Sequence, residues 1–323
     1  MATLASQKLN LTHGQHSVWY LIMPLFLVGC CPPTVMLLWY TNASLGGSWQ
    51  ALGNEMLTNG FWATLWQAWG PHFWGSAAAW AIIGVHAGVQ LVLMKVLPGK
   101  PYEGTLTAMG NTPRYKDNGL ASYVISLALF FTASLGFKWF SPGIVYHHLG
   151  DILGALNITA LVFCLFLYFK GKYFPSSSDS GTTGRFLMDY YWGTELYPRI
   201  FGWDVKMFTN CRFGMTGWAL MVISYAFAQQ EITGTMTNSI AISAALISIY
   251  LFKFFIWESG YMRSIDIIVD RAGFYICWGC LVWVPALYTS PTMFMVNHPL
   301  ELPSWLAVVV FAAPEVRGKS PDY

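Results

Sequence analysis

Long apolar runs are the feature that most restricts how this chain can fold. Each of seven runs has about 20 residues, the length that an α-helix needs to cross a bilayer. They cover residues 18–40, 76–97, 119–137, 149–169, 215–231, 238–257 and 272–296. An eighth run begins near Leu302 and stops within about a dozen residues, which is too short to cross. We therefore predict an all-α fold: a polytopic membrane helix bundle of one domain over residues 1–323, with seven full spans and a truncated eighth.

The composition agrees with a membrane protein and excludes other classes. Of 323 residues, 55% are hydrophobic and 10% are charged, whereas soluble domains average about 25% charged residues. The net charge of +2 gives no attraction for nucleic acid. Tryptophan favours the membrane interface, so the Trp-rich segment 61–74 is predicted to lie there. Cys277 and Cys280 have zinc-knuckle spacing, but no second pair completes a site, so we expect packing thiols and no metal.

Lysine and arginine are concentrated in three alternate loops. These loops run from Lys95 to Lys116, from Lys170 to Arg212 and from Lys253 to Arg271. Because cytoplasmic loops carry an excess of basic residues, we predict that all three loops and the N-terminus face the cytosol. The sequon Asn42-Ala43-Ser44 would then face the opposite side, where it could be glycosylated.

The loop over residues 185–214 is the first functional candidate. It is too charged to be a span, and Gly193 and Pro198 bend its backbone. Asp189, Glu195 and Arg199 could form an ion-paired cluster at the membrane edge. Charged groups near lipid are costly and therefore indicate function, but ion-pair networks also serve only to hold a loop to a bundle. The spacing leaves both interpretations open.

A second polar group opens the last full span. Asp266, Asp270 and Arg271 precede a stripe of aromatic residues. Carboxylates there could act only as helix-end charges, and aromatic stripes are more often core or lipid-facing than ligand-binding. Two other clusters are weaker candidates. Residues 147–151 hold two His and an Asp, too few ligands for a metal, and His86 with Gln90 is expected to make hydrogen bonds between helices.

Several blocks of the sequence resemble one family. The segment DYYWGTELYPRI, Asp189 to Ile200, resembles the signature of the sterol reductases that reduce C14 or C7 double bonds. Most members carry Asn in place of Tyr197, and Tyr there is similar to the plant-type Δ7-sterol reductase branch. The block DRAGFYICWGCLVWVPALYTSP resembles the next one, before which the family usually has His where this chain has Val269. LPGKPYEGTLTAMGNTPRYKDNGL, FSP and WDVKMFTNCRFGM extend the resemblance from about Cys31 to about Leu306.

The resemblance implies NADPH-dependent reduction of the C7–C8 double bond of a 5,7-diene sterol in the endoplasmic reticulum membrane. A proton added at C8 leaves an allylic cation, and a hydride from NADPH completes the reduction. The implied catalytic residues are Asp189, Glu195, Tyr197, Arg199 and Asp270, with the proton donor open among Asp189, Glu195 and Tyr197. The implied substrate-binding residues, whose rings would stabilise a cation, are Tyr190, Tyr191, Trp192, Tyr275, Trp278, Trp283 and Tyr288. Expected partners are the sterol, membrane lipid and other enzymes of sterol biosynthesis.

The segment after Trp305 departs from this family. It reads LAVVVFAAPEVRGKSPDY, which has no likeness to the continuation in which the family builds most of its NADPH pocket. We therefore expect that no cofactor-binding residue is retained and that this chain binds NADPH poorly and has little or no reductase activity. The alternative function is a non-catalytic membrane protein that binds sterol or forms complexes. A transporter is disfavoured, since the sequence shows neither paired repeats nor broken helices.

Overall fold

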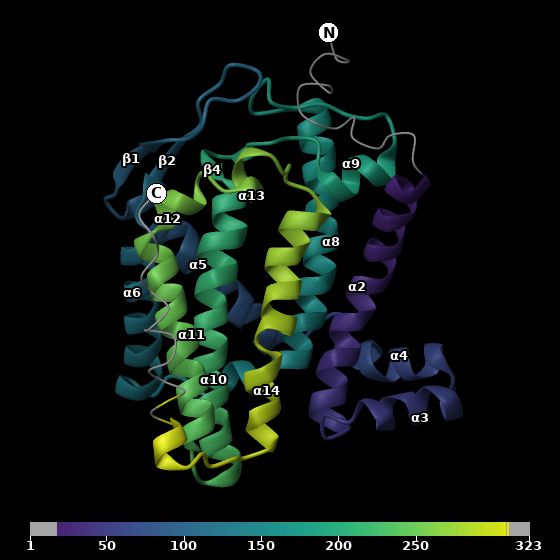
Figure 1. Cartoon of the computed structure of the whole chain (residues 1–323), viewed down its shortest axis with the longest axis vertical. Coiled ribbons are helices and arrows are strands. Elements are labelled where there is room, and N and C mark those ends of the chain that lie inside the picture. The colour runs from purple at the N-terminus through teal and green to yellow at the C-terminus, as the bar shows by residue number, and fades with distance from the viewer. Residues whose placement is uncertain (1–17, 308, 310–323) are drawn as a thin grey trace.

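Long helices packed side by side form the body of the protein (Figure 1). The computed structural model describes residues 18–307 and 309. The long helical elements are α2 (Val18–Ser44), α5 (Ala77–Val96), α6 (Gly119–Phe131) with η2 (Thr132–Gly136), α8 (Leu149–Tyr173), η3 (Met207–Met215) with α10 (Thr216–Thr233), α11 (Asn238–Ile256), and η4 (Phe274–Tyr288) with α14 (Ser290–Asn297). Helices satisfy all their backbone groups internally, which is why they can stand in lipid. The predicted helix bundle is confirmed.

Six of the seven predicted spans coincide with helices that are long and apolar enough to cross a membrane. These helices are Ile22–Ser44, Ala77–Val96, Gly119–Gly136, Leu149–Tyr173, Asn238–Ile256 and Phe274–Asn297. The other predicted span, 215–231, is α10, whose last turns hold the polar residues Gln229, Gln230 and Glu231. α10 packs against α11 and α14 inside the bundle, so its crossing stays a prediction. The eighth run lies only partly within the described residues, which include 302–307 and 309.

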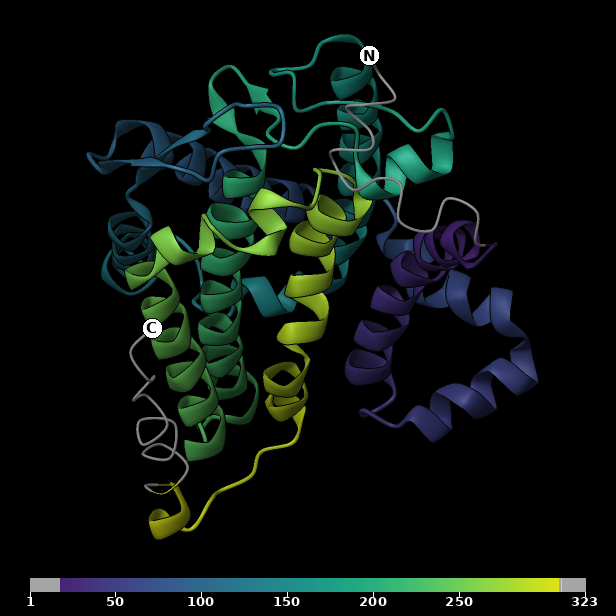
Figure 2. The same cartoon turned by 45° about the horizontal axis from the view of Figure 1, so that its top comes forward.

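The two ends of the bundle differ in structure. One end carries the short elements β1 (Lys100–Glu103), β2 (Arg114–Asp117), α9 (Phe186–Trp192), β3 (Arg199–Ile200), β4 (Trp203–Asp204), α12 (Glu258–Tyr261) and α13 (Ile265–Ile268). Figures 1 and 2 show these elements gathered together, with the start of α2 at the same end. The three basic loops and the start of the first span therefore share one side, as the charge pattern predicts. The two antiparallel pairs, β1–β2 and β3–β4, are small additions to the expected all-helical fold.

A pair of short helices lies beside the opposite end of the bundle. α3 (Trp49–Asn59) and α4 (Phe61–Trp69) run across the direction of the long helices (Figure 1). Trp62 and Trp66 on α4 are 77% and 69% exposed. Tryptophan rings in this position suit the headgroup region of a membrane, so the geometry supports the predicted interfacial segment. α7 (Ile144–His147) and the turn η1 (Gly70–His72) complete this end.

Buried polar contacts join the helices within the apolar core. Trp278 Nε1 on η4 donates to Asn157 Oδ1 on α8 at 2.9 Å, and Asn157 Nδ2 donates to the carbonyl of Pro32 on α2 at 3.0 Å. The interhelical bonds expected of His86 and Gln90 are also present: His86 Nε2 lies 3.0 Å from the Phe213 carbonyl, and Gln90 bonds to Ser126 on α6 at 2.8 Å. Such bonds hold apolar helices in register, because lipid provides no alternative partner.

An ion pair lies deep at the loop-bearing end. Arg212 on η3 and Glu258 on α12 are 1% and 0% exposed, and their side chains pair directly. Glu258 Oε2 also accepts the backbone N–H of Gly119, and Arg212 donates to Asn118 Oδ1 at 2.9 Å. This network ties the starts of α6 and α12 to the last turn of η3, so the short elements of this end sit on a rigid base.

Candidate functional site

The candidate site is built where α9 meets the start of η4. α9 ends at Gly193, whose φ of +93° suits glycine because a side chain would be strained there. A Cβ on Gly193 would lie 2.6 Å from the Ala272 carbonyl carbon, and one on Gly273 would lie 2.3 Å from the Gly193 nitrogen. The two glycines therefore allow two backbone segments, 80 positions apart in the sequence, to touch.

Six of the seven predicted substrate-binding aromatics form one continuous cluster at this junction. Phe274 is its centre: its ring lies 5.9 Å from that of Tyr191 and 4.8 Å from that of Trp278. Trp192 lies 5.5 Å from Tyr275. The cluster consists of Tyr190, Tyr191, Trp192, Phe274, Tyr275, Trp278 and Trp283. Tyr275 is 46% exposed, so one edge of this aromatic cluster faces outward.

Tyr288 contacts a different set of residues. Its ring lies 5.1 Å from Trp218 on α10, at the other end of η4 from Phe274. Phe274 itself was not among the predicted residues, although it precedes Tyr275 in the same block. The sequence of a block with several aromatics does not show which ring faces the core. Only the contact with α9 identifies Phe274 as central.

Asp270 is the predicted carboxylate that lies beside the aromatic cluster. Burial raises the pKa of Asp270, and the neighbouring charge of Asp266 adds to the rise. Burial also raises the pKa of Tyr191 to about 12, and the negative charge of Asp270 contributes to that rise. A half-buried carboxyl group with a raised pKa is suited to hold a proton next to an apolar ligand.

Asp189 and Glu195 have structural partners of their own. Asp189 is 2% exposed, and its Oδ1 accepts from the N–H and the hydroxyl of Thr183 at 2.8 and 2.9 Å. Glu195, also 2% exposed, pairs with Lys170 at 2.7 Å and accepts the N–H of Ser176. Arg199 donates to the carbonyl of Arg114. Within residues 18–307 these three charges do not pair with one another, so the predicted ion-paired cluster is wrong.

Tyr197 lies in a second buried group centred on Lys206. The Lys206 ammonium is fully buried, lies 5.2 Å from the centre of the Tyr197 ring and donates to the carbonyls of Asp266, Ile267 and Asp270. Burial lowers the pKa of Lys206 to about 8, and Asp204 opposes this fall. Burial raises the pKa of Tyr197 to about 12. Lys206 therefore caps the end of α13 and holds the segment that carries Asp270.

The relationships of the chain follow from comparison with known proteins. The model of a family described as the ergosterol biosynthesis ERG4/ERG24 family matches residues 36–314. The chain belongs to this family. The match extends past Leu306, where the resemblance was expected to end.

Relatives within this family carry two enzyme names. The chain is 46% identical to a 7-dehydrocholesterol reductase of Arabidopsis thaliana over 295 residues, which cover 90% of this chain and 66% of the relative. It is 39% identical to a protein of that name from Xenopus laevis over 68% of this chain and 47% of the relative. It is 33% identical to a Delta(14)-sterol reductase of Methylotuvimicrobium alcaliphilum over 89% of this chain and 65% of the relative. The chain thus spans between about half and two thirds of the length of these relatives.

Lys206 is the main residue of the site that the sequence did not single out. It lies inside the family block WDVKMFTNCRFGM, between the apolar residues Val205 and Met207. A lysine flanked by buried Val205 and Met207 is unusual, because lysine is almost never fully buried without partners. A lysine between two apolar residues was therefore the sequence signal that could have identified Lys206. Val269, the position where the family usually has His, is 43% exposed and lies next to Asp270.

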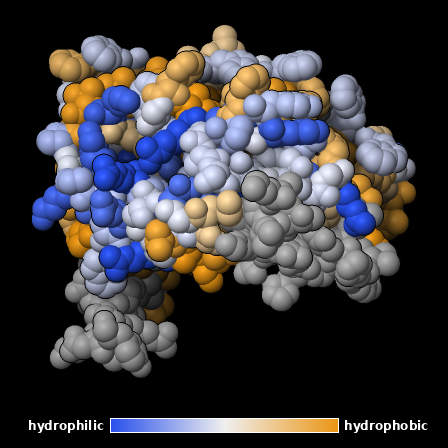
Figure 3. Space-filling model, turned by 90° about the horizontal axis from the view of Figure 1, so that it is seen from above, coloured by the Kyte–Doolittle hydropathy of each residue, from blue (hydrophilic) through white to orange (hydrophobic). Residues whose placement is uncertain are grey.

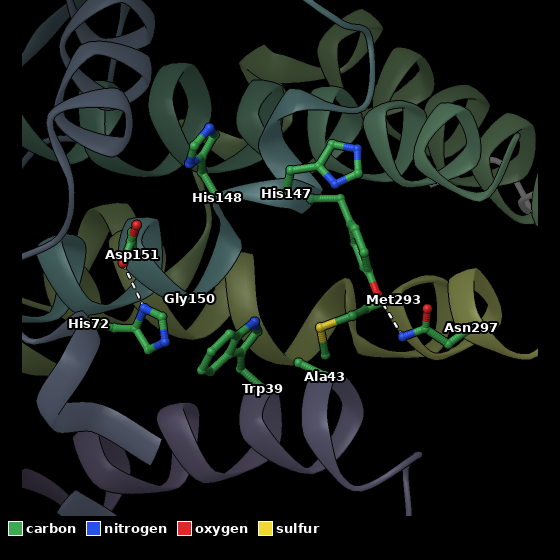
Figure 4. Close-up of a pocket in the computed structure, with 10 residues that line it drawn as sticks. Trp39, Ala43, His72, His147, His148, Gly150, Asp151, Met293 and Asn297 are labelled. Atoms are coloured by element: carbon green, nitrogen blue, oxygen red, sulfur yellow. Dashed lines mark hydrogen bonds and ion pairs between the residues drawn. The ribbon is translucent and has the colours of Figure 1, made fainter. Parts of the chain in front are cut away.

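A cavity at the opposite end of the bundle collects the weaker histidine candidates (Figure 4). His72 Nδ1 lies 2.6 Å from Asp151 Oδ1, and His147 pairs with Glu231 at 2.8 Å. Figure 4 shows the His72–Asp151 pair on one wall and His147 on another. His147 and Asp151 therefore do not converge, and no group of three or more metal-ligating side chains was found among the described residues.

Proposed function

We propose that this chain is the sterol-binding membrane part of an NADPH-dependent reductase that acts on the C7–C8 double bond of 5,7-diene sterols. The observation that carries this proposal is the 46% identity to the Arabidopsis relative over 90% of the chain. The lower identity of 33% to the Delta(14)-sterol reductase favours the C7 bond over the C14 bond. Tyr197, typical of the Δ7 branch, supports the same choice.

The aromatic cluster is the proposed place for the reacting ring of the sterol. A sterol is nearly all hydrocarbon, so it would enter from the bilayer and reach the outward edge of the cluster at Tyr275. Protonation at C8 uses the π electrons of the C7–C8 bond and leaves an allylic cation over C7 to C5. The negative faces of the rings of Tyr191, Trp192 and Tyr275 would stabilise that cation.

Asp270 is our preferred proton donor. Both oxygens of the Glu195 carboxylate are engaged, one by Lys170 and one by the Ser176 N–H, so Glu195 is committed to a buried ion pair and not to a substrate. Asp189 Oδ1 already accepts two hydrogen bonds from Thr183, which tie it to the loop before α9. Asp270 combines a raised pKa with a place beside Tyr191 and Tyr275. Tyr197 belongs to the group around Lys206, so we assign it a positioning role.

NADPH would supply the hydride that completes the reduction at C7. The described cationic cavity that could hold its phosphates has a volume of about 330 Å³, near the lower limit of ligand pockets, which span roughly 300–1,000 Å³. It is large enough for a phosphate-bearing group but not for a whole dinucleotide. This cavity therefore does not hold a whole NADPH molecule by itself, and the proposal assigns none of the residues that line it to the nicotinamide.

We propose the endoplasmic reticulum membrane as the location, with the end that carries β1, β2 and α9 in the cytosol. The basic loops at that end support this orientation. Other enzymes of sterol biosynthesis are the proposed neighbours, because they would deliver and remove a substrate that stays in the bilayer. The alternative function, sterol binding without catalysis, is favoured by the small size of the cationic cavity.

The test is to give the purified chain a 5,7-diene sterol and NADPH and to measure the Δ5-sterol product by mass spectrometry. We expect product only at NADPH concentrations well above those that saturate the Arabidopsis relative. A photoreactive 5,7-diene sterol, crosslinked in parallel, reports binding without turnover. Crosslinking to the α9–η4 junction without product would support the alternative function. If neither product nor crosslinking is detected, both functions are refuted.

A further inference from the structure

A cationic cavity lies at the loop-bearing end, apart from the aromatic cluster. It is bounded by the end of α5, the β1–β2 hairpin, the β3–β4 hairpin and η3, and its volume is about 330 Å³. Seen from above, hydrophilic side chains gather over the side of the molecule that carries β1 and β2 (Figure 3). The charged residues that line the cavity are Lys95, Arg114, Lys116, Arg199, Asp204 and Arg212.

The positive side chains that line this cavity outnumber the acids that face them, although Arg212 is paired with Glu258. Lys116 donates to the carbonyls of Lys95 and Leu97, and Arg199 donates to the carbonyl of Arg114; these partners are neutral. The contact of Arg114 with Glu103 is 3.5 Å long, and both side chains are more than two thirds exposed, so it contributes little. Asp204 is the one acid among the residues that line the cavity. An anion is therefore the ligand that this cavity would attract.

Two buried polar atoms of the same lining residues have no partner. Arg212 Nε and Asp204 Oδ2 make no hydrogen bond with any described residue, although the two side chains are 1% and 6% exposed. A buried polar atom left unpaired costs about 1–3 kcal/mol, so native structures normally provide a partner. Arg212 Nε needs an acceptor and the Asp204 carboxylate needs a donor. A ligand that carries both an anionic oxygen and a hydroxyl group would satisfy the two together.

The cavity also lies close to the membrane surface. Lys95 is in the last turn of α5, which is one of the six candidate spans, and it stands 4.9 Å over the ring of Trp203. Lysine and tryptophan at the end of a span are typical of the headgroup region. The preference of basic residues for cytoplasmic loops explains exposed cations there, but it does not explain the buried unpaired atoms of Arg212 and Asp204.

We propose that this cavity binds a phosphate group flanked by hydroxyl groups, the chemistry shared by the headgroup of a phosphorylated inositol lipid and by a soluble sugar phosphate. Arginine and lysine bind the phosphate oxygens, and Asp204 accepts a bond from a neighbouring hydroxyl. No residue of the aromatic cluster lines the cavity, so its ligand would not contact the proposed sterol site.

The experiment measures binding to the purified full chain in nanodiscs of phosphatidylcholine. The lipid probe is dioctanoyl phosphatidylinositol 4-phosphate, the soluble probe is ribose 5-phosphate, and dioctanoyl phosphatidylcholine is the zwitterionic control. Binding of the lipid probe alone assigns the site to a headgroup, and binding of the soluble probe alone assigns it to a sugar phosphate. In both cases the affinity should fall as salt rises, because exposed charges are screened.

The diagnostic variant replaces both Lys95 and Arg114 with Gln. Both side chains are exposed, so the fold should be kept. The matched control is Arg263→Gln, an exposed cation that stacks on Tyr102 at the same end but does not line the cavity. We expect the double variant to bind about tenfold or more weakly, the equivalent of one lost charged hydrogen bond, and the control to bind normally. Failure of both probes to bind, or equal weakening of binding in the double variant and in the control variant, would overturn the proposal.

Discussion

At the scale of single residues, Asp270 and Lys206 depend on each other. The Lys206 ammonium binds the carbonyl of Asp270 and two carbonyls of α13, and thereby orients the segment that presents the Asp270 side chain. Both groups have pKa values moved by burial, upward for the acid and downward for the base. Each shift makes the neutral form more accessible near neutral pH, which is the condition for proton transfer in an apolar setting.

The first prediction concerns Asp270→Asn. Asparagine keeps the shape but cannot donate a carboxylic proton, so the rate of Δ5-sterol formation should fall by about 10²–10⁴. The wild-type rate should decrease as pH rises through the raised pKa of Asp270, because only the protonated acid is active. The residual rate of the variant should not show that decrease. Rate–pH profiles of both proteins are the measurement, and an unchanged rate in Asp270→Asn would contradict the role.

The second prediction concerns Lys206→Met. Between about pH 8 and the ordinary lysine value of 10.5, Lys206 is neutral in the folded protein and charged in the unfolded chain. The unfolded state then binds more protons, so stability from this group rises with pH in that window and is constant below it. The thermal unfolding midpoint in detergent should therefore rise more between pH 7.5 and pH 9.5 in the wild type than in the Met variant. Identical shifts would show that Lys206 is already neutral at pH 7.5 or does not titrate.

At the scale of elements, the loop before α9 is held to α8 by one buried ion pair. Lys170 lies in the last turn of α8, and Glu195 lies beyond Gly193. The same carboxylate accepts the N–H of Ser176, so it joins the two ends of the 176–195 segment. Gly171 faces this contact, where a Cβ would lie 2.2 Å from the Thr194 hydroxyl. The structure thus supports a structural role for Glu195, one of the two interpretations that the spacing left open.

The third prediction concerns Glu195→Gln. Removal of one partner leaves the Lys170 charge, only 11% exposed, without compensation, at a cost of about 3–5 kcal/mol. The segment 176–185 should open more readily, and limited proteolysis there should accelerate. Glu103→Gln is the control, because its contact with Arg114 is exposed and should not matter. Equal proteolysis of the two variants would show that the Glu195 pair does not hold the loop.

At the scale of the whole molecule, charge and polarity are divided between the two ends. The basic loops, the aromatic cluster and the cationic cavity lie at one end, and α3, α4 and the histidine cavity lie at the other. A membrane protein can maintain such a division because charged loops do not readily cross the bilayer. The sequon at Asn42 lies inside the last turns of α2, with its amide bonded to the Leu38 carbonyl, so we no longer expect glycosylation there.

The fourth prediction concerns this division. A cysteine placed at the exposed Ser178 should react with a membrane-impermeant maleimide in intact microsomes, because the proposed orientation puts that end in the cytosol. A cysteine at the exposed Asn59 in α3 should react only after the membrane is permeabilised. The four most buried native cysteines, Cys164, Cys211, Cys277 and Cys280, should contribute little background. Reaction of both sites from the same side would contradict the arrangement.

Much of the fold could be predicted from the sequence because membrane spans are local features. Length and hydropathy within one segment decide whether a helix can cross, and basic loops decide its orientation. The family blocks also led to the correct family and to six of the seven cluster aromatics. α10 was harder to judge, since Gln229, Gln230 and Glu231 find their place only against neighbouring helices.

The sequence by itself determined the helix bundle, the side on which its polar loops gather and the family to which it belongs, because each depends on residues close together in the chain. Only the tertiary structure decided the partners of the charges. Glu195 pairs with Lys170 and not with Arg199, and Lys206 binds carbonyls some 60 positions away. A buried charge takes the partner that folding brings beside it, and that choice depends on contacts between distant segments that no local pattern contains.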